Sequence, residues 1–240
     1  KTPQRWVPRW LPTVLALAVI ACVSLHRLDR PMLWADEAQT GIGARNILRV
    51  GYPSAFDGRN AAVIDSGRTL DQDLTFKQIP WVTFYVGAAS MALFGDDTAG
   101  LRTLFAVIGV LAFFPIHALL RRRVGFPALI TALVLLSPQV LLFQRNARYY
   151  SCLIFLFAML LWLVTTDIAS RRARVVLAVL LFVLLFHTHV AVALCCGCTV
   201  LAFCALFRRP LLRDFAVAVA AGLLSWIAWY RCLGPSLGVA

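Results

Sequence analysis

The sequence predicts an all-α, polytopic transmembrane protein, and three observations carry that prediction. Of the 240 residues, 61% are hydrophobic and 14% are charged, whereas soluble domains carry about 25% charged residues. The apolar residues form runs of the length that a bilayer-crossing helix needs, about 20 residues. The basic residues fall in short clusters between these runs. The formal charge of +12 therefore indicates membrane topology, and without a basic stripe interleaved with aromatics we expect no nucleic-acid partner.

About seven spans are predicted. As one helix, the long apolar stretch 175–207 would extend about 50 Å, too long for one crossing. We therefore expect it to divide at His187-Thr188-His189. The predicted spans are 11–26, 102–120, 124–143, 151–167, 175–190, 190–207 and 215–231.

The run Ile79–Phe94 decides the orientation. It is short for a span, so we expect it to lie in the membrane interface or to re-enter. If it does not cross, the four basic clusters (around Arg5, 121–123, 171–174 and 208–213) all face the cytoplasm. The amino terminus is then inside, and the outer segments are the loop 27–101, the turn 144–150 and the link 187–189.

Asp36 and Glu37 are the candidate catalytic residues of this outer loop. They precede 38–50, whose apolar spacing predicts a helix along the bilayer that ends at Gly51. One interpretation makes Asp36 the N-cap of that helix, with Gln39 completing a capping box. The other makes Asp36 a general base at the membrane surface, with Glu37 orienting it or binding a divalent cation.

Cationic residues are predicted on the same membrane face. Arg102, Arg145, Arg148 and Lys77, with Tyr149, are candidates to hold a phosphate, which arginine contacts through paired hydrogen bonds. The alternative for each is that the side chain reaches lipid headgroups. A carboxylate and several cations on one face favour a lipid-phosphate substrate, which the cations stabilise as it leaves.

Three segments resemble membrane glycosyltransferases of the GT-C fold. The group in question contains the dolichyl-phosphate-mannose protein mannosyltransferases and the bacterial aminoarabinose transferases of lipid A. The resemblance covers about residues 33–163. Its segments are LWADEAQTGIGARNILRVGYP, FKQIPWVTFYVGAASMALFGDDTAGLRTLFAVIGVL and LLSPQVLLFQRNARYYSCLIFLFAMLLWL.

The resemblance implies a polyprenyl-phosphate sugar donor and transfer on the periplasmic or lumenal face. It implies Asp36 as the catalytic carboxylate, Glu37 as its partner in the motif and Lys77 as a phosphate contact. The aminoarabinose transferases carry a further aspartate after the third span, whereas 145–150 contains none. Family members are longer, so we expect 1–240 to be a single transmembrane domain forming the amino-terminal part of a longer chain.

We therefore expect an integral protein of the bacterial inner membrane, with its active site on the periplasmic side. Its expected partners are the donor, membrane lipids and an acceptor glycan, lipid or protein. Two alternatives remain: a transporter or flippase of a lipid-linked substrate, and a non-catalytic membrane subunit. No cofactor is certain. A divalent metal is possible, at Glu37 or where Cys195, Cys196 and Cys198 follow the two histidines.

Overall fold

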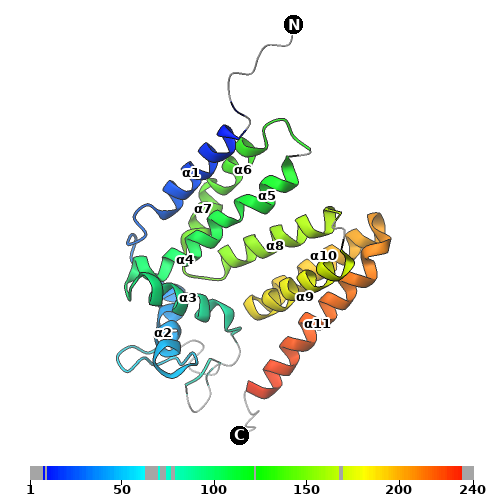
Figure 1. Cartoon of the computed structure of the whole chain (residues 1–240). Helices are drawn as coiled ribbons and strands as arrows, with labels where there is room; N and C mark the ends of the chain where they lie inside the picture. The colour runs from blue at the N-terminus through cyan, green and yellow to red at the C-terminus, as the bar shows by residue number, and fades with distance from the viewer. Residues whose placement is uncertain are drawn as a thin grey trace.

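The computed structural model describes residues 8, 10–62, 70, 74–76, 79–121, 123–167 and 170–233. Its named elements over these residues are all helices, which confirms the all-α class (Figure 1). They are α1 (Leu11–Leu25), α2 (Ala35–Val50), α3 (Val82–Phe94), α4 (Thr98–Leu111), α5 (Phe113–Leu120), α6 (Pro127–Leu135), α7 (Pro138–Arg145), α8 (Tyr150–Thr165), α9 (Arg171–Thr188), α10 (Val190–Phe207) and α11 (Arg209–Leu233).

Three helical stretches among the described residues are long and apolar enough to cross a membrane. They are Thr98–Leu120, which joins α4 and α5, Val190–Phe207 and Arg209–Cys232. A fourth crossing is formed if α6 and α7, bent by 65°, count as one span. These lengths and compositions are those of a helical membrane protein. The other predicted spans fall on α1, α8 and α9, so the count of seven stays a prediction.

Helix α2 ends where the sequence predicts but begins earlier. Gly51 closes it with φ 88°, a left-handed conformation that glycine adopts without strain. Its N-cap is Trp34, in extended conformation, and Asp36 and Glu37 lie in the first turn. The interpretation of Asp36 as N-cap is therefore wrong. In the first turn both carboxylates face the positive end of the helix dipole.

The short helix α3 packs between α2 and α4. Its 13 residues extend about 20 Å at 1.5 Å per residue, less than the hydrocarbon core of about 30 Å. Its side chain Phe84 stacks on Phe76, with ring centroids 5.0 Å apart, and both are buried. This core holds the loop after α2 against α3. A helix of this length fits the prediction that α3 stays on one side of the membrane, which remains a prediction about topology.

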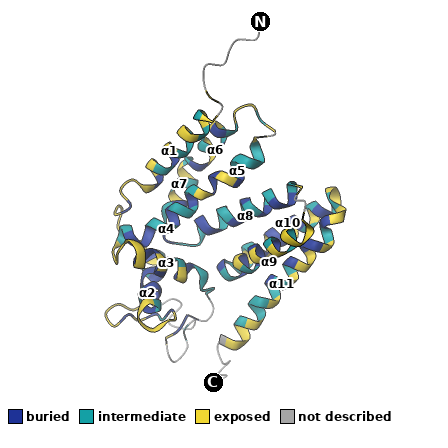
Figure 2. Cartoon of the chain, viewed as in Figure 1, coloured by how far each residue is buried: buried dark blue, intermediate teal, exposed yellow. Residues whose placement is uncertain are grey.

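The long apolar stretch 175–207 divides as predicted. Helix α9 ends at Thr188, His189 is extended (φ −162°, ψ 107°), and α10 begins at Val190. Helices α8 to α11 share one hydrophobic core, in which Phe182, Phe186 and Phe215 are buried. Figure 2 shows exposed positions along the outer faces of α10 and α11, and several of them are large apolar side chains. Such faces suit contact with lipid.

Candidate functional site

Glu37 and Arg102 form a buried ion pair at the centre of the predicted site. Glu37 is completely buried and Arg102 is 3% exposed. Nε of Arg102 donates to Oε1 of Glu37 at 2.8 Å, and Nη2 donates to Oε2 at 2.6 Å. The backbone N–H of Ala147 donates to Oε1 at 2.8 Å. The pair therefore joins α2, α4 and the turn between α7 and α8.

The remaining donors of Arg102 bind the segment that follows α1. Nη1 donates to the carbonyls of Leu28 (3.0 Å) and Pro31 (2.7 Å), and Nη2 donates to that of Met32 (3.4 Å). A guanidinium has five N–H groups, and here each has a protein acceptor. Arg102 thus holds this segment in place and has no free N–H group to donate to a phosphate. This differs from its predicted role as a phosphate contact.

Asp36 lies one residue away from Glu37 in a different environment. Its side chain is 41% exposed, and Oδ2 lies 3.3 Å from Nη2 of Arg148, which is 12% exposed. Nη1 of Arg148 also donates to the carbonyl of Asp36 (3.2 Å) and to Oε1 of Gln39 (3.4 Å). The sequence predicts that Asp36 and Arg148 lie on the same face of the membrane. In the structure their side chains are in direct contact.

Two buried donors beside Asp36 have no protein partner among the described residues. They are Nε of Arg148 and Nε2 of Gln39. An unpaired buried donor costs free energy, so these groups are better satisfied when a ligand or water supplies an acceptor. The polar site therefore has hydrogen-bonding capacity that its own side chains do not use.

Tyr149 and His189 extend the site toward the end of α9. Their rings meet edge to face, 4.7 Å apart between centroids. Burial raises the pKa of Tyr149, and its hydrogen bond with Tyr150 adds to this, while Arg148 opposes it. Burial also lowers the pKa of His189, and the charge of Arg148 lowers it further against a hydrogen bond with its own backbone. Both side chains are therefore neutral near pH 7.

Two cavities are lined by neighbours of Asp36 in the sequence or in space, although Asp36 itself is not among their lining residues. The first cavity, of about 590 Å³, is lined by the segment after α1, by α7 and by Arg102, and it includes Trp34, Glu37 and Arg145. The second cavity, of about 340 Å³, is lined by residues 79, 80, 83 and 84 at the start of α3, by Arg148 and Tyr149, and by residues 188–191. Trp34 and Glu37 thus line the first cavity, and Arg148, the ion-pair partner of Asp36, lines the second.

The predicted cations do not form a single cluster. Arg145 lines the first cavity and donates to the carbonyls of His26 (2.5 Å) and Arg27 (3.1 Å), whereas Arg148 lines the second. Lys77 lies outside the described residues. No group of three or more His, Cys, Asp or Glu side chains that could hold a metal ion occurs within the described ranges. Both Glu37 oxygens already accept from protein donors.

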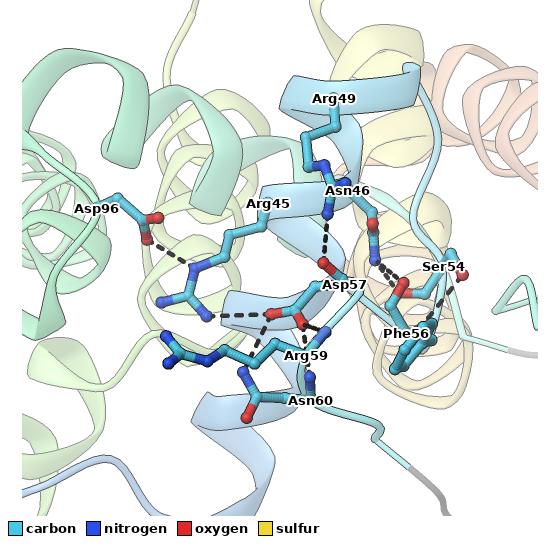
Figure 3. A network of polar contacts seen from close by, with 9 residues as sticks. All are labelled: Arg45, Asn46, Arg49, Ser54, Phe56, Asp57, Arg59, Asn60 and Asp96. Atoms are coloured by element: carbon cyan, nitrogen blue, oxygen red, sulfur yellow. Dashed lines mark hydrogen bonds and ion pairs between the residues drawn. The ribbon is translucent and has the colours of Figure 1, made fainter.

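The loop after α2 is held by a second polar network (Figure 3). Arg45 bridges two carboxylates, with Nε 2.7 Å from Asp96 and Nη1 3.3 Å from Asp57. Oδ1 of Asp57 accepts the backbone N–H groups of Arg59 (3.0 Å) and Asn60 (2.7 Å). Burial works to raise the pKa of Asp57, but these hydrogen bonds and Arg45 lower it to about 2.

Three positions near the site were not part of the sequence hypothesis: Trp34 in the first cavity, Gln39 as a partner of Arg148, and His189 in the second cavity. For His189 a signal existed, because a histidine divides a long apolar stretch at what the sequence predicts to be the outer face. For Trp34 and Gln39 no signal existed beyond their nearness to Asp36 in the sequence. The chain matches no family model, no curated protein and no solved structure.

Proposed function

We propose that this chain is a membrane glycosyltransferase that moves a sugar from a polyprenyl-phosphate donor to an acceptor, with Asp36 as general base. One observation carries the proposal most: of two adjacent carboxylates, Glu37 is buried in an ion pair, whereas the side chain of Asp36 is 41% exposed and pairs with Arg148, which lines the second cavity. A base must reach the proton that it removes. Only Asp36 meets that requirement.

The proposed reaction takes its donor and its inversion from the resemblance and its base from the exposure of Asp36. An Asp36 oxygen accepts the proton of an acceptor hydroxyl or amine, and the acceptor atom attacks the anomeric carbon of the sugar. The bond from that carbon to the phosphate oxygen breaks, and its electron pair leaves with the phosphate. Attack opposite the leaving group inverts the anomeric carbon. Arg148, paired with Asp36, stabilises negative charge as it develops.

Glu37 and Arg102 act as positioning residues in this account. Their ion pair orients the first turn of α2 against Ala147, and so sets Asp36 beside Arg148. The first cavity has largely apolar walls that suit an isoprenoid or acyl chain, with Arg145 at its polar part. Lys77 remains a phosphate contact by the resemblance alone.

The proposed setting is the bacterial inner membrane, with seven spans and the site on the periplasmic side. The four basic clusters then face the cytoplasm, and Asp36 and His189 lie at the opposite, outer face. The 1–240 chain acts as one transmembrane domain, with a GT-C-like arrangement of spans and juxtamembrane helices α2 and α3. The acceptor is a glycan, a lipid or a protein.

Transport of a lipid-linked substrate is the second candidate. The 65° bend between α6 and α7 favours it, because transporters build substrate sites from discontinuous helices near the bilayer midplane. The positions of the acidic groups favour the enzyme, since Asp36 and Glu37 both lie in the first turn of α2 and not at the bend between α6 and α7, where a transporter of this kind would place its charged site. A non-catalytic subunit would need neither an exposed carboxylate nor two adjacent cavities.

The test is transfer of labelled sugar from a polyprenyl-phosphate donor by the purified full chain in vesicles. Wild type is compared with Asp36→Asn. The matched control is Asp29→Asn, because Asp29 is an exposed carboxylate of the same loop (61% exposed) paired with Arg30. We expect transfer by wild type and Asp29→Asn. Movement of the intact donor across the bilayer without transfer would replace the enzyme with the transporter.

A further inference from the structure

The break between α9 and α10 brings a histidine into the second cavity. His189 lines this cavity together with Arg148 and Tyr149. Its ring packs edge to face on Tyr149, and its extended backbone starts α10 at Val190. The residues just before α8 and the first residues of α10 therefore meet at one cavity.

This cavity has the electrostatic character of an anion site. Arg148 supplies a cation, which is paired with Asp36 at 3.3 Å, and no carboxylate is among the described side chains that line the cavity itself. The amino-terminal ends of α8 and α10 add to it, since each helix amino terminus carries about half a positive charge and unsatisfied N–H groups. The buried Nε of Arg148 has no acceptor in the described part of the chain.

The hydrogen bonding of His189 fixes which ring nitrogen can donate. Nδ1 accepts the backbone N–H of Val192 at 3.4 Å. In the neutral imidazole the proton is then on Nε2, which is a donor. Burial, and then the charge of Arg148, lower the pKa of His189, so the neutral form prevails near pH 7. His189 therefore offers one N–H to a ligand while its other nitrogen caps α10.

We propose that the second cavity binds a phosphate group, with His189 Nε2 and Arg148 as side-chain donors and the first turn of α10 as a backbone donor. The inference rests on the proposed function, which supplies the class of ligand: the phosphate of a lipid-linked sugar. At about 340 Å³ the cavity lies within the range of ligand pockets, about 300–1,000 Å³. His189 then holds the donor next to the carboxylate of Asp36.

Two substitutions of His189 separate its capping role from its donor role. His189→Ala removes both. His189→Asn retains a side chain that caps helices well but reaches less far. The matched control is His187→Asn. His187 lies two residues earlier, contacts Ser225 and Trp229 of α11, and is not among the residues of the cavity.

Farnesyl phosphate is titrated into the full chain in non-ionic detergent by calorimetry, with farnesol and inorganic phosphate as separate ligands. We expect wild type to bind farnesyl phosphate and not farnesol. Loss of one hydrogen bond to a charged group weakens binding on the order of tenfold or more, so both His189 variants lose that much. His187→Asn keeps the wild-type affinity. Thermal unfolding checks that each variant is folded.

Binding of inorganic phosphate with the same dependence on His189 identifies a site for free phosphate, and binding of farnesyl phosphate alone identifies a lipid headgroup site. Wild-type affinity in both His189 variants, or no phosphate binding by wild type, overturns the inference. His189-dependent binding without any sugar transfer keeps this site and removes the proposed function. Sugar transfer together with phosphate binding that does not depend on His189 keeps the proposed function and removes this site.

Discussion

Arg102 of α4 and Glu37 of α2 lie 65 residues apart in the sequence and form two hydrogen bonds of 2.8 and 2.6 Å in the buried centre of the site. Removing one partner of a buried pair leaves an uncompensated charge, which costs about 3–5 kcal/mol. We expect Glu37→Gln and Arg102→Gln each to lower the unfolding temperature strongly. In the double variant the losses are less than additive, because the partners share one interaction.

The measurement is thermal unfolding of the purified chain in detergent, followed by circular dichroism. Arg145→Gln serves as a control, since within the described ranges the Arg145 side chain donates to two carbonyls after α1 and to no carboxylate. Single variants with wild-type unfolding temperatures would show that the pair does not hold the site together.

Packing between α2 and α3 gives a second prediction. A Cβ at Gly43 would lie 2.5 Å from a ring atom of Phe84, and that ring is itself stacked on Phe76. We expect Gly43→Ala to destabilise the protein by about 1–3 kcal/mol, as overpacking of a filled core does. At Gly41, on the same helix, a Cβ would meet only the end of Leu101 at 3.3 Å.

Gly41→Ala is therefore the control, and its effect should be small because the Leu101 side chain can move. Both variants are compared by unfolding in the same detergent. A Gly43→Ala variant as stable as Gly41→Ala would mean that α2 and α3 are not in close contact.

The low pKa of Asp57, about 2, predicts a pH dependence for the loop after α2. An unfolded aspartate has a pKa of about 3.9. Because the folded value is lower, the ionised carboxylate stabilises the loop above about pH 4, and this contribution is lost as the pH falls toward about 2. We expect Asp57→Asn to be less stable than wild type at pH 6.

Protease cleavage of the loop is the measurement, using an enzyme active at each pH. At pH 6 Asp57→Asn is cleaved faster than wild type, and near pH 2 the two rates converge. Asp29→Asn, which removes an exposed carboxylate, gives wild-type rates at pH 6. Equal rates for wild type and Asp57→Asn at pH 6 would rule out a stabilising role for the network in Figure 3.

The topology follows from whether α3 crosses the membrane. Single cysteines are placed at Asp96, after α3, and at Arg123, after α5, in a variant without the seven native cysteines. In intact cells we expect a membrane-impermeant maleimide to label the Asp96→Cys variant and not the Arg123→Cys variant. The reverse pattern would show that α3 spans and that the basic cluster 121–123 lies outside.

Periodicity and apolar length were enough to predict several elements. Helix α2 and its end at Gly51, and the break of 175–207 at His189, depend on local sequence, so both predictions are confirmed. The interpretation of Asp36 as N-cap, one of the two left open, is wrong because Trp34 caps α2 through its backbone conformation, without a side-chain hydrogen bond. Backbone conformation of this kind leaves no residue-type signal.

The candidate site was predicted as a set of residues but not as an arrangement. Topology alone put Asp36 and Arg148 on one face, and the structure pairs them at 3.3 Å. The predicted topology could not reveal that the N–H groups of Arg102 all donate to Glu37 and to backbone carbonyls, since those contacts depend on how α4 packs against α2. The predicted topology also could not show that Arg145 and Arg148, which are three residues apart in the sequence, line different cavities.

The central claim is the division of roles between adjacent carboxylates, and turnover of Asp36→Asn in a folded protein tests it most directly. The account predicts that the rate of sugar transfer falls by a factor of about 10² or more, as expected for loss of a positioned base. The unfolding temperature of Asp36→Asn stays equal to that of wild type and of Asp29→Asn. Wild-type turnover by folded Asp36→Asn would contradict the account.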